Sequence, residues 1–497
     1  MRETELKLSV HPSFIVPTMD GGRFHLEEGP VLDLRATYYD TEDLRLARSG
    51  ATLRHRLGER DEDGWTLKLP AESRAPNTRE EIRIPGSSTV VPDEARDLVT
   101  AFARNAPLVP VARLRTRRRT WAVVDEDGAT VAELADDEVS ILEQRRVVAR
   151  FRELEVESRG LDDEGLKEVA AALGTAGALP AEPIPKAVRA LGPRATAPPD
   201  VPAPENLQPD EPAARAISAA IATSVRRLIR NDPLTRMGDV EGLHQQRVAA
   251  RRLRSDLRTF GPLIHPDWAG PLVNELKWLG ELLGDVRDLD ILQARLRAKM
   301  GTSQEGVGTL FASLVTRHEK ARDRMVRELR SERYKGLLDR LVDAAAEPAL
   351  TEEAFRPSGE ALPPLVATAW KKLAKRGRTL EPDAPNEALH KVRIRAKRAR
   401  YAAEAVAPVL GSATTEAARF AARAEAVQDV LGAHQDAAVG QEVFRAFAEE
   451  HPQDGPINLT MGRLIEREAQ EGRETRDRFF KVWKKLDRKK NRRWLAA

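Results

Sequence analysis

The sequence predicts an α+β chain of two domains: an antiparallel β-rich N-terminal domain with a few helices, then an all-α domain. Three observations carry this prediction. The hydrophobic period changes from two to 3.6 along the chain, a proline-rich stretch separates the two patterns, and the second part repeats itself. A chain of 497 residues also exceeds what one hydrophobic core usually supports.

The domain boundary is predicted at a stretch that holds seven prolines in twenty residues, Pro193–Pro212. Proline fixes its own φ angle and lacks a backbone donor, so such a stretch favours an extended, semi-rigid spacer. We therefore expect a domain over residues 1–192, a linker over 193–212 and a second domain over 213–497.

The N-terminal part alternates apolar and polar residues, which is typical of half-buried strands. Strands are expected at Thr52–Arg56, Trp65–Leu69, Glu81–Ile84, Ala112–Val124, Thr130–Leu134 and Arg152–Glu157. Two helices are expected between them, near Asp93–Asn105 and Asp163–Gly174. The pattern predicts an antiparallel sheet with flanking helices.

The C-terminal part contains an internal duplication. His244-Gln-Gln-Arg247-Val-Ala-Ala-Arg251 matches His390-Lys-Val-Arg393-Ile-Arg-Ala-Lys397 at an offset of 146 residues, and a later LGDVRD matches LGAHQD at an offset of 148. Each copy has room for about four helices of ordinary length. Two duplicated four-helix bundles are expected, over about 213–350 and 362–497.

Composition narrows the possible chemistry. The chain has no cysteine, which excludes disulfides, thiol catalysis and thiolate metal sites. No apolar run approaches the length of a membrane span, and the N-terminus has no apolar signal segment, so a cytoplasmic protein is expected. Residues 1–200 hold 29 basic against 36 acidic side chains, which leaves 52 against 42 for the rest. A basic second part suits a polyanion.

Charged residues share faces along the N-terminal strands. Glu3, Glu5 and Lys7 alternate on one strand, and Glu153, Glu155 and Glu157 on another. Half-exposed antiparallel sheets commonly carry a solvated polar face, which is one interpretation. The other closes the sheet into a barrel with these faces inward. Carboxylates that hold Mg²⁺ or Mn²⁺ and cations that hold phosphate oxygens would then form a metal–triphosphate site.

Each repeat motif of the second part places its cations on one helical stripe, opposite an apolar stripe. A single basic stripe is usually a solvated face, but such faces normally carry carboxylates four residues away, and these stripes nearly lack them. A metal role for His244 or His390 is not expected, because the surrounding cations would repel the ion. Two copies at equal spacing favour a polyanion-binding surface.

The ETELK start resembles the ExExK signature of the CYTH superfamily, the triphosphate tunnel metalloenzymes. The rest of residues 1–192 is similar in order: YYDTEDLRLARSGATLRHR, GWTLKLP, REE, RRTW, ELADDEV, ELEVE and PKAVRAL. The resemblance implies an antiparallel tunnel barrel and a metal-dependent triphosphatase. It implies catalytic roles for Glu3, Glu5 and Lys7.

Further site residues are implied by the same resemblance. The metal, Mg²⁺ or Mn²⁺, would be held by carboxylates: Glu3, Glu5, Asp137, Glu153, Glu155 and Glu157. The triphosphate would be bound by cations: Lys7, Arg54, Arg56, Lys68, Arg118 and Lys186. The strand register leaves Asp136 open as an alternative to Asp137, and Arg117 or Arg119 as alternatives to Arg118.

The duplicated motif, each copy followed by Leu-Gly-x-x-x-Asp, resembles the CHAD domain, a helical domain with a basic cavity for inorganic polyphosphate. The order CYTH then CHAD is itself similar to a known arrangement. The second copy differs where Arg287 becomes Gln435. The resemblance implies polyphosphate contacts from His244, Arg247, Arg251, Arg252, Arg254, Arg258, His390, Arg393, Lys397, Arg398, Arg400, Arg226 and Lys371.

Three functions compete at this point. The first is a metal-dependent triphosphatase tethered to a polyphosphate-binding module. The second is a non-catalytic protein that binds polyphosphate or decorates polyphosphate granules. The third, nucleic-acid binding, ranks last because the basic part lacks interleaved aromatic residues for base stacking.

Overall fold

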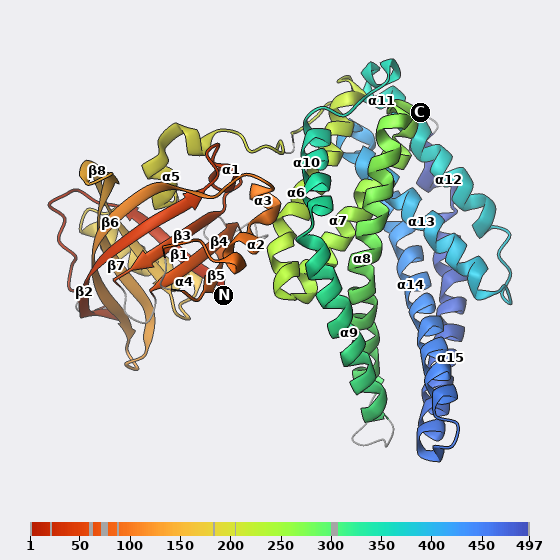
Figure 1. Ribbon diagram of the computed structural model, residues 1–497. Helices are drawn as coiled ribbons and strands as arrows, with labels where there is room; N and C mark the ends of the chain where they lie inside the picture. Colours follow the sequence, from red (N-terminus) through yellow and green to blue (C-terminus); the bar gives the residue numbers. More distant parts are fainter. Residues whose placement is uncertain are drawn as a thin grey trace. The chain divides into compact units, whose positions relative to one another are not determined.

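The computed structural model describes residues 2–19, 22–58, 63–70, 78–86, 89–181, 184–203, 205–299 and 307–495. It divides into two compact units, Met1–Asp200 and Val201–Ala497, and each is described by itself. The first unit is built around an antiparallel sheet and the second from helices (Figure 1). This agrees with the α+β prediction.

The first unit holds a sheet whose strands close on themselves. Its strands are β1 (Arg2–Ser9), β2 (Phe24–Asp40), β3 (Thr52–Leu57), β4 (Gly64–Pro70), β5 (Thr78–Ile84), β6 (Val109–Asp125), β7 (Thr130–Glu143), β8 (Arg146–Ser158) and β9 (Leu179–Pro180). They lie in the order β5-β4-β3-β2-β6-β7-β8-β1-β9. Because β1 also pairs with β5, strands β1 to β8 form a continuous ring.

Apolar packing on the outside of this ring fixes which side chains point inward. Helix α4 (Asp163–Thr175) buries Val169 and Leu173 against the strands. Leu154 and Val156 of β8 face this cluster and are fully buried in it. Since neighbouring residues of a strand point to opposite faces, the glutamates that alternate with them on β8 point into the ring. The remaining helices are α1 (Arg45–Arg48), α2 (Asp93–Leu98), α3 (Thr100–Ala103) and α5 (Lys186–Leu191).

The strand β2 was not predicted from the sequence. It contains Gly29 and Pro30, which read as a turn, yet the strand continues through them with a bulge opposite β6. A Cβ on Gly29 would lie 2.5 Å from the hydroxyl oxygen of Thr120, and that hydroxyl donates to the carbonyl of Pro30 at 3.0 Å. The glycine therefore permits a close approach between strands rather than a chain reversal.

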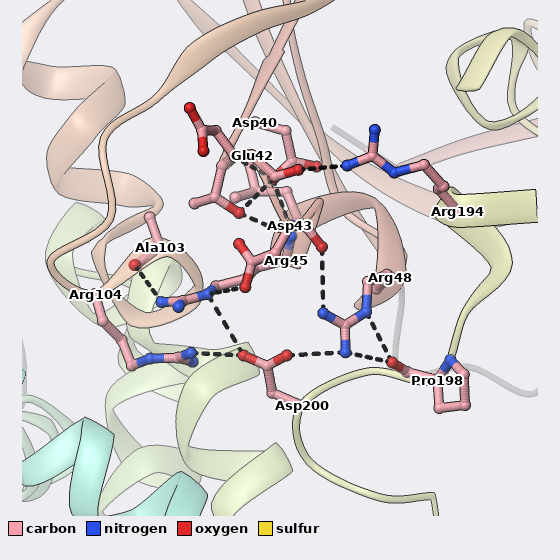
Figure 2. Close-up of polar contacts among 12 residues, drawn as sticks. Asp40, Glu42, Asp43, Arg45, Arg48, Ala103, Arg104, Arg194, Pro198 and Asp200 are labelled. Carbon is pink, nitrogen blue, oxygen red and sulfur yellow. Dashed lines mark hydrogen bonds and ion pairs between the residues drawn. The ribbon is translucent and has the colours of Figure 1, made fainter. Parts of the chain in front are cut away.

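The start of the proline-rich stretch is not the extended spacer that its composition predicted. Residues Gly192–Thr196 form a 3₁₀ helix, and Ala195 is buried with residues of the α1 region. Figure 2 shows Asp200 among three arginines of the first unit. Its carboxylate lies 2.5 Å from Arg104, 3.0 Å from Arg48 and 3.6 Å from Arg45. Buried apolar contacts and ion pairs therefore outweigh the preference of a proline-rich segment for an extended conformation.

Replacing Asp200 with alanine should release this segment, because the three arginines share its carboxylate. We expect faster tryptic cleavage after Arg194, whose guanidinium donates to the carbonyl of Glu42 at 2.8 Å in the docked state. The measurement is the rate of that cut in the full chain. Asp210→Ala, at an exposed position of the same proline-rich stretch, is the control. An unchanged cleavage rate in the Asp200 variant would contradict the docking.

The second unit contains nine helices of fifteen or more residues among its described residues. They are α6 (Ala213–Met237), α7 (Val240–Thr259), α8 (Pro266–Lys299), α9 (Val307–Leu329), α10 (Glu332–Ala346), α12 (Pro363–Gly377), α13 (Asn386–Val406), α14 (Thr414–Glu450) and α15 (Gly455–Leu486). A short α11 (Ser358–Ala361) joins the halves. Both repeat motifs lie on the second long helix of their half, α7 and α13, and these two helices pack against each other. None of the described helices is long and apolar enough to span a membrane.

Candidate active site and anion-binding centre

A charged cavity of about 420 Å³ lies inside the ring of strands. Its charged lining comes from β1, β3, β4, β5, β6, β7, β8, the N-terminus of α5 and Arg159, which directly follows β8. The side chains are Glu5, Lys7, Arg54, Arg56, Lys68, Glu81, Arg83, Arg118, Glu133, Asp137, Glu155, Glu157, Arg159 and Lys186. The inward faces therefore carry cations and carboxylates together, as the barrel interpretation of the sequence requires.

Three cations surround two carboxylates at the centre of this cavity. Arg118 donates to both oxygens of Asp137, at 2.8 and 2.7 Å, and to Glu155 at 3.0 Å. Lys186 lies 2.8 Å from Asp137 and 2.7 Å from Glu155. Lys7 also pairs with Glu155. The cationic groups thus converge on one point from β1, β6 and α5.

Mutual neutralisation keeps these buried groups charged. Burial alone would lower the pKa of Lys186, but Asp137 and Glu155 outweigh it and raise that pKa. Burial likewise favours the protonated form of Glu155, yet Lys186, Lys7 and Arg118 hold its pKa well below the usual range. Charges are tolerated in an interior only when they are paired or bind ions. An arriving anion would therefore meet fixed, fully charged cations.

A row of carboxylates lies at another part of the cavity. Glu5 of β1 pairs in register with Glu157 of β8, which in turn pairs with Glu133 of β7. Like charges directly opposite one another destabilise a sheet, and Arg159 offsets only part of this, at 3.3 Å from Glu133 and 3.6 Å from Glu157. Hard carboxylate oxygens are the ligands that Mg²⁺ and Mn²⁺ prefer. The donor set therefore fits a divalent ion in its chemistry, although no three carboxylates in the described part are already grouped closely enough to hold one.

Further cations line the cavity from β3 and β4. Arg54 and Arg56 project from β3, and Lys68 from β4 lies 2.8 Å from Glu81. The Nε of Arg54 is buried and has no hydrogen-bond partner within the described residues. A buried donor without a partner is costly, which makes it available to a ligand oxygen.

The strand register separates the alternatives that the sequence left open. Asp137 and Arg118 point into the cavity, whereas Asp136 points outward and accepts two hydrogen bonds from Arg152, both at 2.8 Å. Arg119 lies outside too, 2.8 Å from Glu138. Arg117 is exposed on the same outer face.

Two predicted glutamates take other positions. Glu153 is fully buried behind the cavity, 3.0 Å from Lys186 and 3.2 Å from Arg189. The backbone of Glu3 pairs with Arg79, but its side chain lies outside the described residues. Sequence reasoning missed Glu133, whose signal was present: it lies four residues before Asp137, so both share one strand face.

The second unit brings the two basic stripes together. The charge of Arg393 on α13 interacts with that of Arg247 on α7, and Lys397 interacts with Arg393, Arg251 and Arg247. Burial, together with these cations, lowers the pKa of Lys397 to about 7. Four cations from both copies of the motif therefore form one group, which we name the α7–α13 centre: Arg247, Arg251, Arg393 and Lys397.

The Leu-Gly-x-x-x-Asp motifs support this centre. A Cβ on Gly284 would lie 3.3 Å from a terminal nitrogen of Arg247, and a Cβ on Gly432 would lie 3.7 Å from Arg393. Gly284 thus leaves room for the arginine of its own half, whereas a Cβ on Gly432 would make an ordinary van der Waals contact with Arg393. Asp288 of the first motif lies 3.1 Å from Arg247. The second motif's aspartate, Asp436, interacts with Arg393 and Lys397, and burial raises its pKa.

Other predicted polyphosphate contacts lie apart from the α7–α13 centre. Arg252 and Arg400 both pair with Glu404, the latter at 2.6 Å. Burial and three neighbouring arginines, among them Arg258 and Arg254, lower the pKa of Arg398, which marks a second cationic group on the same two helices. His390 contacts Gln435 at 2.8 Å, and the pKa of His244 is lowered by burial and by Arg287. Arg226 and Lys371 are exposed on α6 and α12.

Comparisons with known proteins agree with both units. The CYTH domain model matches residues 1–184 and the CHAD domain model matches residues 219–445. Uncharacterized protein Rv2226 of Mycobacterium tuberculosis strain H37Rv is 32% identical over 523 residues, covering 98% of this chain and 96% of the relative. Uncharacterized protein MT2285 of strain CDC 1551 gives the same identity and coverage.

Solved structures are similar over part of this chain. PptA from Streptomyces chartreusis is 22% identical, with 55% of this chain and 99% of that chain covered and a TM-score of 0.46. The CHAD domain from the plant Ricinus communis is 25% identical, with 57% and 96% covered and a TM-score of 0.46. A putative adenylyl cyclase from Hippeastrum, HpAC1, is 16% identical, with 39% and 98% covered and a TM-score of 0.23.

The class of the protein follows from the family matches and the whole-length relatives. It is a two-domain chain in which a CYTH domain precedes a CHAD domain. The chain belongs to the CYTH–CHAD family, and this confirms the resemblance predicted from the sequence. At the level of the superfamily, membership of the CYTH group implies divalent-metal-dependent phosphoryl chemistry in the first domain.

Proposed function

We propose that the chain is a metal-dependent triphosphatase that hydrolyses inorganic triphosphate or related phosphoanhydrides, and that its helical domain binds inorganic polyphosphate. The observation that carries the proposal is the convergence of Lys7, Arg118 and Lys186 with Arg54 and Arg56 on a cavity that also presents a row of carboxylates. Cations bind phosphate oxygens, and carboxylates bind the divalent ion that accompanies a triphosphate. The closed ring of strands would form the tunnel.

Each group in the cavity has a distinct task in this proposal. Glu5, Glu157 and Glu133, with Glu3, would hold Mg²⁺ or Mn²⁺, which when bound neutralises charge on the phosphate oxygens. Lys7, Arg118 and Lys186 would bind the oxygens of the phosphates and stabilise the charge that develops as the phosphoanhydride bond breaks. Because these cations are held rigidly by Asp137 and Glu155, they need little rearrangement during the reaction.

The helical domain would bind polyphosphate through the α7–α13 centre. Both copies of the duplicated motif contribute two cations each to it, so we infer that the two halves form paired bundles around one anion site. Asp288 and Asp436 neutralise only part of the four positive charges. A linear polyanion would supply the remaining negative charge by contacting several cations at once.

The binding of a polyanion to this centre should weaken as pH rises above 7. Below the pKa of about 7, Lys397 is charged before the ligand arrives; above it, binding must draw a proton onto the amine. We expect polyphosphate affinity to fall by up to about tenfold per pH unit between pH 7 and 9 at constant salt. Calorimetric titration measures this, and Lys397→Arg, which stays charged, should flatten the dependence. An equally steep fall in the arginine variant would show that another group titrates.

A second candidate function is non-catalytic binding of polyphosphate, including association with polyphosphate granules. One observation favours it: Asp137 and Glu155 are already occupied by cations. A phosphate-release assay on tripolyphosphate, with and without Mg²⁺ or Mn²⁺, tests the enzymatic proposal against this one. Competition between polyphosphate and RNA for the chain tests the lower-ranked nucleic-acid function.

A further inference from the structure

The outer surface of the strand ring carries a second, larger concavity that the proposed reaction does not use. It has a volume of about 1150 Å³ and is formed by the outward faces of β2, β6, β7 and β8. Seven arginines line it against two carboxylates, Asp33 and Glu138. We name this surface the arginine groove, and its arginines are Arg35, Arg113, Arg115, Arg117, Arg145, Arg150 and Arg152. The alternating arginines of β6 noted in the sequence belong to it.

Strand register arranges the outward residues in rows across the sheet. One row reads Asp33, Arg117, Glu138 and Arg152 on β2, β6, β7 and β8, so acids and bases alternate in it. Cross-strand neighbours of opposite charge stabilise a sheet. Such alternation of acidic and basic residues is expected of an ordinary solvated polar face.

The next row lacks that neutralisation. It reads Arg35, Arg115, Ser140 and Arg150 on the same four strands. Arg35 stands directly opposite Arg115, at a cross-strand spacing of about 5 Å, where like charges destabilise the sheet. Asp33 satisfies Arg115 through two hydrogen bonds of 2.9 and 2.6 Å. The row therefore retains excess positive charge that a bound anion would relieve.

Five arginines of the groove form no side-chain hydrogen bond or ion pair within the described residues: Arg35, Arg113, Arg117, Arg145 and Arg150. All five are exposed. Guanidinium groups bind phosphate oxygens through two parallel hydrogen bonds, which makes such an array suited to a densely charged phosphate polymer.

The lining favours inorganic polyphosphate over nucleic acid. Binding to single-stranded nucleic acid usually relies on exposed aromatic rings on which bases stack. Phe151 is the aromatic residue in this lining; it is half-buried, and the guanidinium of Arg189 lies over its ring at 4.8 Å. The groove therefore offers charge without a stacking surface.

The groove and the catalytic cavity use opposite faces of the same strand pair. Ala36 of β2 and Leu114 of β6 are partners in register and line both spaces. We propose that the arginine groove is an exosite that binds long polyphosphate chains and so favours them over short phosphoanhydrides at the cavity. This inference rests on the proposed triphosphatase function.

The test compares two substrates in the full chain. Arg35→Glu with Arg150→Glu should raise KM for long-chain polyphosphate by about 25-fold at 0.1 M salt, since two phosphate contacts are lost. Hydrolysis of tripolyphosphate, the short substrate of the cavity in this proposal, should keep its kcat and KM. The control is Arg146→Glu with Lys167→Glu, at exposed positions of the same unit that do not line the groove. If charge reversal disturbs folding, the charge-neutral variant Arg35→Gln with Arg150→Gln is used instead.

Equal losses on both substrates, or none on either, would overturn the exosite. An effect on RNA binding without an effect on polyphosphate would also overturn it and assign the groove to nucleic acid. If the wild-type chain releases no phosphate, the proposed function fails. The exosite is then tested separately, by measuring the binding of long polyphosphate. In a chain whose α7–α13 centre is reversed to glutamates, residual binding of long polyphosphate should then be lost on adding Arg35→Glu with Arg150→Glu. Binding that persists would contradict the exosite.

Discussion

Replacing Glu5 with glutamine is expected to lower metal-dependent hydrolysis of tripolyphosphate by about 100-fold or more, the scale seen when one charge-stabilising group is removed from an active site. The substitution keeps the shape of the side chain but removes the negative charge that a divalent ion requires. Glu5 stands at the end of the row formed with Glu157 and Glu133, so its loss weakens the metal donors and, among the central cations, removes only a 3.6 Å contact with Lys7.

Stability should change little in this variant. The side chain of Glu5 is 22% exposed, and its ion pair with Lys7, at 3.6 Å, is the one it forms within the described residues. Circular dichroism melting checks the fold, and Glu143→Gln, at an exposed position of β7, is the matched control for activity. Glu155→Gln offers a contrast: it removes the partner of Lys7, Arg118 and Lys186, so both activity and melting temperature should fall. Wild-type activity in the Glu5 variant would contradict its assigned role.

Reversing either half of the α7–α13 centre should remove most polyphosphate binding. Each neutralised phosphate releases a counterion, and two lost contacts correspond to about a 25-fold loss at 0.1 M salt, with charge reversal adding to this. We expect Arg247→Glu with Arg251→Glu, and Arg393→Glu with Lys397→Glu, to weaken binding to a similar extent. The slope of log affinity against log salt should fall by about 1.4 in each double variant.

The control for this experiment changes the same charge on a face away from the centre. Arg317 and Lys320 are exposed on α9 and form no ion pair within the described residues, so their double reversal should cost little affinity. Losses of equal size in the control would mean that net charge alone governs binding. Wild-type affinity in both α7 and α13 variants would show that the two stripes are ordinary solvated faces.

The fold class could be predicted from local sequence patterns, whereas the closure of the strands into a ring could not. Alternation and helical periodicity are local, so they identified most strands and the helical character of the second part. Strand β2 was not predicted; it contains Gly29 and Pro30, and the contact with Thr120 that accommodates them lies ninety residues away in sequence. The start of the proline-rich stretch differs from the expected spacer for the same reason, since the ion pairs of Asp200 join segments distant in sequence.

In the candidate site, too, local patterns could be predicted from the sequence, whereas features that depend on long-range contacts could not. Alternation placed Glu155 and Glu157 on one face, but it could not choose between Asp136 and Asp137 within one strand, because either register gives a regular pattern. The pairing of β7 with β6 and β8 decides between them. Asp137 points into the ring and forms an ion pair with Arg118, whereas Asp136 points outward and forms an ion pair with Arg152. In the helical domain, each stripe was visible in the sequence, whereas their meeting across α7 and α13 depends on tertiary packing.

Phosphate release by the full chain tests the central claim most directly. Purified protein would be incubated with tripolyphosphate, long-chain polyphosphate, nucleoside triphosphates and thiamine triphosphate, each with Mg²⁺, with Mn²⁺ and with a chelator. We predict metal-dependent release from at least tripolyphosphate, lost in Glu5→Gln and retained in Glu143→Gln. The absence of release from every substrate with either metal would contradict the triphosphatase proposal and leave the non-catalytic polyphosphate-binding function in its place.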